Sequence, residues 1–217
     1  MSVVVAQKLK NNKGWVIGAE SYIGSHGRKE VSPGIKIFHP DDNTDIIVGL
    51  VGYAGDANIL EATSELIDYQ SIRRESLSTR NIVNHTVKKI QDKLREFGRL
   101  ELDSGKFFWE SNIIICHKDK AFEISPDFTV VEIKEFQTIG FPESFVHGMD
   151  ILYNSLVDNK IIKEIDAEAK VVEFIKLAID HCEYVSYPIT IMNSLTQETK
   201  TYSKADLEEV NPIKKIK

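Results

Sequence analysis

The chain has 217 residues, of which 42% are apolar and 28% charged, and its formal net charge is −6. These proportions are typical of a folded globular protein and argue against an intrinsically disordered chain. The negative net charge argues against non-specific nucleic-acid binding, which needs clustered Lys and Arg to neutralise phosphates. Nothing in the composition requires disulfides or another staple, because a chain of this length can bury a large core.

The sequence predicts a cytoplasmic protein with no membrane-spanning segment. No apolar run approaches the roughly 18 residues that span a bilayer. The apolar start at residues 2–6 is short and is followed at once by Gln7 and Lys8, unlike a signal peptide. Cys116 and Cys182 are the two cysteines. They form no disulfide framework of the secreted kind, and we expect them to be small buried side chains.

The first elements are predicted to form a β-hairpin. Residues 2–9 and 15–23 are rich in apolar and β-branched side chains, and residues 11–14 between them are Asn-Asn-Lys-Gly. Two such runs joined by Asn and Gly are typical of a hairpin. Both runs are nearly continuous in apolar residues, so we expect this sheet to be covered on both faces.

A loop and two shorter strands are predicted next. Residues 24–34 contain several Gly and a Pro and are predicted to be a loop. Residues 35–38 and 45–52 are predicted strands, and the second ends in a Gly-rich segment. Asp56 then suits the N-cap of a helix over residues 57–69, because its side chain can accept a free backbone N–H.

The next helix is predicted to begin near Thr79 and to end at Gly98. Its apolar positions recur every four or three residues, which defines one helical face. That face comprises Ile82, Thr86, Ile90, Leu94 and Phe97.

From Phe107 onward the period changes to that of strands. The predicted β-meander has strands at residues 112–116, 120–124, 129–134 and 137–139. Two helices follow, one with an apolar face of Phe145, Met149, Leu152 and Leu156, the other with Val171, Ile175, Ala178 and Cys182. Residues 188–194 and 198–202 form a predicted closing hairpin.

Strands, two helices, strands, two helices and strands therefore follow one another, with no linker between them. Grouped strands and grouped helices indicate an α+β layered fold rather than an alternating α/β fold. Each helix pair needs a sheet face on which to bury its apolar stripe. The sequence thus predicts one domain over residues 1–217, a four-layer αββα sandwich.

The order and spacing of several short segments resemble the proteasome β-subunit family and its HslV-type bacterial relatives. The similarity covers most of the chain. It lies in residues 2–6 (SVVVA), 14–21 (GWVIGAES), 36–38 (KIF), 48–57 (VGLVGYAGDA) and 137–140 (QTIG). The resemblance implies the N-terminal-nucleophile version of the αββα sandwich.

Carried over residue by residue, the resemblance implies a catalytic site. Ser2, exposed by removal of Met1, would be the nucleophile where the family prefers Thr, and its own α-amine would be the general base. Lys36, paired with Glu20, would lie near the Ser2 oxygen. The Gly52 N–H would donate to the oxyanion, and Glu183 and Ser186 would support the amine.

The sequence departs from the family pattern at several of these positions. Glu20 and Glu183 stand where the family has Asp, and a misplaced carboxylate can cost about 100-fold in rate. The family usually has Gly-Ser-Gly where this chain has Gly140-Phe141-Pro142, so a supporting Ser is missing. Tyr187-Pro188 replaces two glycines.

The same residues also have structural explanations that the sequence leaves open. Ser2 suits an ordinary strand start, and Lys36 suits an edge-strand lysine that discourages aggregation. Glu20 suits a solvated strand end, and Gly52 a tight turn. Glu183 and Ser186 suit a helix end and a loop.

The resemblance implies a peptidase that cleaves peptides or unfolded proteins inside a self-assembled homo-oligomer, with an ATP-dependent unfoldase as a partner. Two alternatives remain. One is a catalytically inactive paralogue that acts as an assembly or binding subunit, and the other is an amidohydrolase acting on a small amide. No cofactor is expected, and no metal, because the histidines lack ligand spacing and the contiguous His181-Cys182-Glu183 is poor geometry for zinc.

Overall fold

The computed structural model describes residues 2–10, 13–25, 28–31, 36–39, 46–52, 78–103, 105–183 and 185–209. The strands are β1 (Val3–Lys8), β2 (Trp15–Glu20), β3 (Tyr22–Ser25), β4 (Arg28–Val31), β5 (Ile37–Phe38), β6 (Ile46–Val51), β7 (Glu101–Asp103), β8 (Lys106–Phe108), β9 (Asn112–His117), β10 (Lys120–Ile124), β11 (Val130–Ile133), β12 (Phe136–Gly140), β13 (Ile189–Asn193) and β14 (Thr199–Tyr202). The helices are α3 (Thr79–Asn81), the π-helical η2 (Ile82–Val87), α4 (Lys88–Glu96), α5 (Glu143–Asp158), α6 (Ala167–His181) and α7 (Lys204–Glu209).

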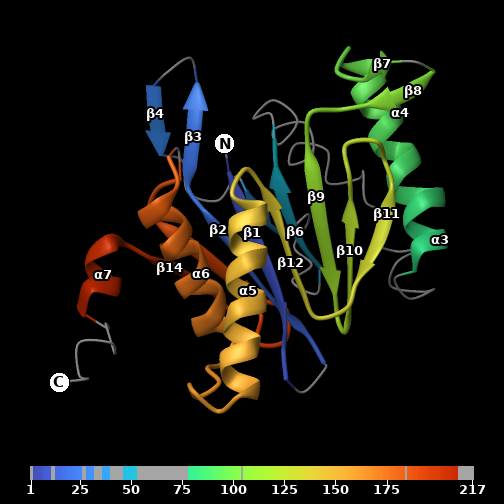
Figure 1. Cartoon of the computed structure of the whole chain (residues 1–217). Helices are drawn as coiled ribbons and strands as arrows, with labels where there is room; N and C mark the ends of the chain where they lie inside the picture. Colours follow the sequence, from blue (N-terminus) through green and yellow to red (C-terminus); the bar gives the residue numbers. More distant parts are fainter. Residues whose placement is uncertain are drawn as a thin grey trace.

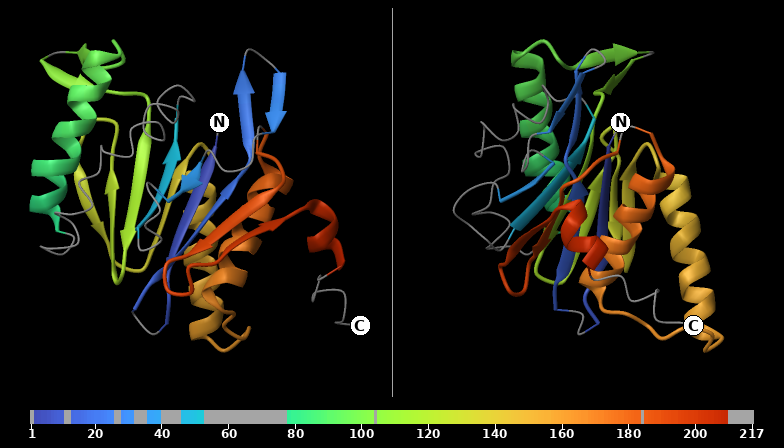
Figure 2. Two further views of the ribbon diagram at one scale, coloured as in Figure 1. Left: turned by 180° about the vertical axis from the view of Figure 1, so that it is seen from behind. Right: turned by 90° about the vertical axis from the view of Figure 1, so that its left-hand side faces the viewer.

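Two five-stranded antiparallel sheets form the middle of the molecule (Figure 1). The first sheet has the order β12-β1-β2-β13-β14, and the second has the order β11-β10-β9-β6-β5. Helices α5 and α6 cover the outer face of the first sheet, and α3, η2 and α4 lie on the outer face of the second (Figures 1 and 2). The described elements therefore form the predicted four αββα layers.

Three apolar clusters fill the spaces between these layers. The cluster between the two sheets, here called the intersheet core, includes Val4, Ala6, Ile17, Ile114 and Ile139. Alternate residues of the same strands face the helices, because successive side chains of a strand point to opposite faces. Every residue of β2 is buried, as expected for a strand covered on both faces.

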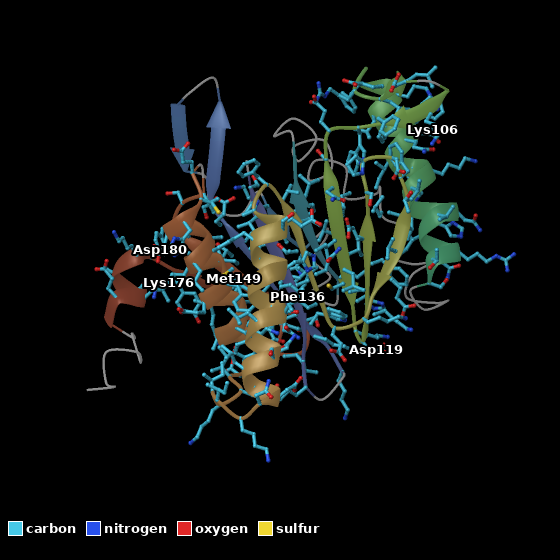
Figure 3. All side chains as sticks on the ribbon, viewed as in Figure 1. Lys106, Asp119, Phe136, Met149, Lys176 and Asp180 are labelled. Atoms are coloured by element: carbon cyan, nitrogen blue, oxygen red, sulfur yellow. The ribbon has the colours of Figure 1, made fainter. Side chains whose placement is uncertain are left out.

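The layer of α5 and α6 also holds a buried charge. Lys170 of α6 lies 2.6 Å from a carboxylate oxygen of Asp150 of α5. Its ammonium is within 6 Å of the ring centroids of Phe136, Tyr153 and Phe174. Figure 3 shows Phe136 and Met149 where α5 covers the first sheet. The ion pair connects α6 to α5, and the cation–π contacts connect Lys170 to rings of α5, α6 and β12.

The helix predicted from Thr79 contains a π-helical stretch, which explains its unusual spacing. Ile82, Thr86, Ile90 and Leu94 are all fully buried although they are four residues apart. An α-helix turns every 3.6 residues, so a strict spacing of four drifts around it, and the wider π-helical turns correct that drift. Phe97, predicted to lie on the same face, is 54% exposed, because the helix ends at Glu96.

Other predictions need correction. Residues 24–34, predicted to be a loop, include strand β4 and the end of β3, which pair with each other. The fourth strand of the predicted meander, β12, pairs with β1 of the first sheet instead of with β11. The small β7–β8 hairpin was not predicted. The predicted helix over residues 57–69 lies outside the described residues.

The predicted buried face of α5 was wrong. Val146 is fully buried and Met149 packs beside it, but Leu152 is 60% exposed and Phe145 is 39% exposed. This helix has apolar side chains around most of its circumference, so their spacing alone does not identify the inward face. By contrast, the predicted face of α6 is confirmed at Val171, Ile175 and Ala178. No helix among the described residues is long and apolar enough to cross a membrane.

Candidate active site at the start of the first strand

Ser2 lies directly before β1, and the end of β12 holds it there. The Phe141 N–H donates to the Ser2 carbonyl at 3.1 Å, and Val3 pairs with Gly140. Gly140 has a φ of +113°, and a Cβ on it would lie 1.9 Å from the Ser2 carbonyl oxygen. Only glycine therefore allows β12 to approach the start of the chain so closely.

The Ser2 side chain faces the space between the two sheets. Val3 and Val5 belong to the cluster under α5 and α6, whereas Val4 and Ala6 belong to the intersheet core. Because side chains alternate along a strand, Ser2 lies on the same side as Val4. The Ser2 hydroxyl therefore lies on the side of the intersheet core, at the end of the sandwich where β1 begins, and not on the side of the helices.

Glu20, at the end of β2, joins three segments of chain at this point. Its side chain is fully buried, and its Oε1 accepts a hydrogen bond from the Lys36 ammonium. The same oxygen accepts the Val3 N–H at 3.2 Å, and Oε2 accepts the Ser186 N–H at 3.4 Å. The extra methylene of Glu relative to Asp therefore does not prevent the carboxylate from reaching the lysine.

Lys36 reaches this carboxylate from the other sheet. Its carbonyl accepts the Leu50 N–H at 2.7 Å, so it lies beside β6, and its side chain is 9% exposed. Burial lowers the pKa of Lys36, and the charge and hydrogen bond of Glu20 partly oppose that shift. Since Glu20 also holds the Val3 N–H, the Lys36 ammonium lies beside the peptide bond that joins Ser2 to Val3.

Gly52 follows β6 at the same end of the sandwich. Lys36 lies beside Leu50 and reaches Glu20, which accepts the Val3 N–H at the start of β1. Strand β6 therefore runs toward the end of the sandwich where β1 begins (Figure 1). Gly52 has a φ of +139°, and a Cβ there would lie 2.4 Å from the Glu110 carbonyl oxygen and from the Ser111 Oγ. Gly52 therefore leaves no room for a side chain, because its backbone packs against Glu110 and Ser111, directly before β9.

Glu183 and Ser186 differ in their placement. The backbone of Ser186 contacts the site, since its N–H reaches Glu20 and its carbonyl accepts the Ser21 N–H at 3.2 Å. Glu183 is exposed in the turn after α6 and forms no hydrogen bond or ion pair with the other candidate residues described here. The structure therefore brings Ser2, Glu20, Lys36 and the Ser186 backbone together, and Glu183, three residues before Ser186, is exposed. Met1 lies outside the described residues.

Sequence reasoning missed two polar residues at this end of the fold. The Ser21 hydroxyl donates to the Pro188 carbonyl at 2.8 Å, which ties the end of β2 to the segment before β13. Asn112, the first residue of β9, has a buried Oδ1 that finds no hydrogen-bond partner within the described part of the chain. Ser21 is adjacent to Glu20 in the sequence, but Asn112 is far from the other site residues, and only the pairing of β9 with β6 reveals its position. Among the described residues, no group of His, Cys, Asp and Glu has the arrangement of a metal site.

Comparison with known proteins identifies the fold. No protein-family model matches the chain, and no curated protein sequence matches it. The solved structure of Thiobacillus denitrificans BPH in complex with epoxomicin is similar, with a TM-score of 0.65 and 19% identity over 88% of this chain and 97% of that one. A second structure of Thiobacillus denitrificans BPH has a TM-score of 0.61 and 17% identity over 93% and 99% of the two chains. This likeness confirms the predicted proteasome-like αββα fold.

Proposed function

We propose that the chain is an N-terminal-nucleophile peptidase in which Ser2, released by removal of Met1, attacks the peptide bond. The observation that supports this most strongly is the buried Glu20 carboxylate, which holds both the Lys36 ammonium and the Val3 N–H. A buried ion pair is costly to assemble. Its place beside the first strand residue gives it a chemical role in the reaction of Ser2.

In the proposed reaction, the Ser2 Oγ attacks the substrate carbonyl carbon, and its proton passes to the α-amine of the same residue. An unperturbed α-amine has a pKa of about 7.7–8.0, so a useful fraction is neutral near pH 7.5. The carbon–nitrogen bond of the substrate then breaks, and the leaving amine takes the proton. Water hydrolyses the resulting ester, which returns Ser2 with its hydroxyl and amine intact.

Lys36 acts electrostatically in this scheme. A positive charge near the Ser2 oxygen stabilises the developing alkoxide and favours the neutral form of the nearby amine. Glu20 keeps the ammonium in position, because it is the anchor shared by Lys36 and the strand that contains Ser2. The pair is buried, so its field is screened less than that of a surface pair.

The Gly52 N–H is the proposed donor to the oxyanion of the tetrahedral intermediate. Its place at the carboxyl end of β6, on the side where β1 begins, supports that role. One such donor is typically worth about 2.7–4 kcal/mol of activation free energy. Ser186 supports the site through its backbone contact with Glu20, and Glu183 is assigned to the support of the amine on the sequence resemblance alone.

The proposal extends to assembly. We propose a single domain that assembles into a homo-oligomer and acts on peptides or unfolded proteins in the cytoplasm. The fold similarity to Thiobacillus denitrificans BPH supports the single domain and the assembly. A closed oligomer would restrict access to extended chains, and an ATP-dependent unfoldase would supply them. Mass in solution tests the assembly, and a monomer at all concentrations would contradict it.

The activity is tested with protein purified without an N-terminal tag. Intact mass shows whether Met1 has been removed, and hydrolysis of casein and of a panel of fluorogenic peptides measures the rate. We expect cleavage by the wild type and by Ser155→Ala, an exposed serine of α5 that serves as the matched control. Ser2→Ala should lose the activity. Retention of Met1 on every molecule, or equal rates for Ser2→Ala and wild type, would refute the peptidase.

A second candidate function is an inactive paralogue that serves as an assembly or binding subunit. The observation that favours it is the exposed position of Glu183 in the turn after α6. A further point is Phe141, which contacts the Ser2 carbonyl through its backbone and offers no side-chain hydrogen bond to the amine. Oligomer formation with Met1 retained and no hydrolysis would support this function over the first.

A further inference from the structure

Asn112 has a buried hydrogen-bond acceptor with no partner at the end of the sandwich where the chain begins. Its Oδ1 is inaccessible to solvent and accepts no hydrogen bond from the residues that the structure describes. Its Nδ2 is not among the buried atoms without a partner. Buried polar atoms without partners are uncommon, and they cost free energy unless something else satisfies them.

The Asn112 side chain points into the space between the sheets. Asn112 pairs with Val51 of β6, and Val51 belongs to the intersheet core. Residues directly opposite each other in an antiparallel pair have their side chains on the same face. Ile114, two residues further along β9, also lies in the intersheet core, and the alternation of side chains gives the same result.

Asn112 and Ser2 also lie at the same level of the sandwich. Gly49 of β6 pairs with Ile114, and a Cβ on Gly49 would lie 2.7 Å from the Val4 side chain, so these residues face one another across the gap. Ser2 is two residues before Val4, and Asn112 is two residues before Ile114. Each step of two residues covers about 6.6 Å toward the same end.

Contacts between strands of the two sheets also place Asn112 near Ser2. Strand β12 lies over β9, just as β1 lies over β6. The end of β12 is the segment that holds Ser2, through Gly140 and Phe141. Asn112, at the start of β9, therefore faces the point where β12 meets the start of β1.

We propose that Asn112 is a positioning residue whose Oδ1 accepts a hydrogen bond from the α-amine of Ser2 once Met1 is removed. A free α-amine is a strong donor and is the group that removal of Met1 would place at this end. Two described donors at this end, the Val3 N–H and the Lys36 ammonium, already donate to Glu20. The inference rests on the proposed function in one respect, the exposure of Ser2 as the first residue.

The test measures the protonation of the Ser2 α-amine and does not depend on peptidase activity. A cleavable N-terminal fusion is removed so that Ser2 is the first residue, and the pH profile of competitive acetylation of its α-amine is followed by peptide mapping. The profiles of wild type, Asn112→Leu and Asn112→Asp are compared. Thr86→Val is the matched control, because Thr86 also has a buried oxygen without a partner among the described residues but belongs to η2, on the outer face of the second sheet.

We expect Asn112→Leu to move the acetylation profile to lower pH, because the charged amine loses an acceptor that stabilises it. Asn112→Asp should move it to higher pH, because a nearby carboxylate favours the ammonium. A shift of about one pH unit would change the acetylation rate about tenfold at pH values below the midpoint. Thr86→Val should match the wild type.

Superimposable profiles for wild type and both Asn112 variants would overturn the inference. If Asn112→Leu fails to fold, the Asn112→Asp profile decides alone, and an unshifted midpoint is the contradicting result. An amine that responds to Asn112 in a protein that cleaves no peptide would contradict the proposed peptidase but not the positioning role. Peptide cleavage by a protein whose α-amine does not respond to the Asn112 variants would contradict the positioning role but not the proposed peptidase.

Discussion

The buried ion pair between Lys36 and Glu20 allows the sharpest prediction about the energetics of the site. The two side chains are 9% and 0% exposed. Removing one partner of such a pair leaves an uncompensated buried charge and typically costs about 3–5 kcal/mol. We therefore expect Lys36→Met to lower the free energy of unfolding by that amount. Glu20→Gln should cost a similar amount, because the ammonium loses its counter-charge.

The double variant, Lys36→Met with Glu20→Gln, should cost clearly less than the sum of the two single changes, because no charge is left buried. Urea unfolding followed by tryptophan fluorescence measures all three, since Trp15 lies fully buried in the intersheet core. Lys93→Met is the control. Its ion pair with Glu96 is exposed, and such pairs are worth about 0–1 kcal/mol.

Equal losses of stability in Lys36→Met and Lys93→Met would refute this reasoning, and so would strict additivity in the double variant. The first result would mean that the lysine is not buried against Glu20. The second would mean that the two groups do not interact. Either result would also remove the main support for a charged group beside Ser2.

Three further predictions concern other parts of the fold. Gly140→Ala should destabilise the protein by more than about 1 kcal/mol, because its φ of +113° disfavours a side chain, whereas Gly148→Ala in α5, with open space around it, should stabilise by up to about 1 kcal/mol in thermal unfolding. Burial raises the pKa of Tyr202 from 10.0 to about 12, so the stability due to its neutral form is present below pH 10.0 and is lost as the pH rises through about 12. Tyr202→Phe should remove that part of the alkaline loss of stability in urea titrations, and an unchanged pH dependence would contradict the assignment. Lys170→Met should lower stability by about 3–5 kcal/mol, since it breaks the buried pair between α5 and α6, and a loss below about 1 kcal/mol would contradict its burial.

Much of the fold follows from local pattern, because central strands such as β2 and β6 are continuously apolar and α6 has one apolar face. The stripe of Val171, Ile175 and Ala178 was sufficient to orient α6. The same reasoning failed for α5, where apolar side chains such as Leu152 surround the helix. It also failed for β12, because the choice of sheet depends on pairing with β1, far away in the sequence.

In the candidate site too, some residues were predicted from the sequence and others were not. Ser2, Glu20 and Lys36 were predicted through their resemblance to a family motif, and the last two form a buried pair. Glu183 was predicted in the same way, yet it is exposed, whereas that pair is buried. Asn112 was not predicted, because an Asn at a strand start has no local signature and its importance arises only from strand pairing.

The most direct test of the account is the covalent labelling of Ser2 by an epoxyketone. The hydroxyl adds to the ketone and the α-amine opens the epoxide, so labelling requires both groups of a free N-terminal residue. We expect intact wild-type protein to gain the whole mass of epoxomicin, with tandem mass spectrometry locating it on Ser2, and Ser2→Ala to gain none. Protein with Met1 removed that gains no adduct, or gains one elsewhere, would contradict the assignment of Ser2 as the nucleophile.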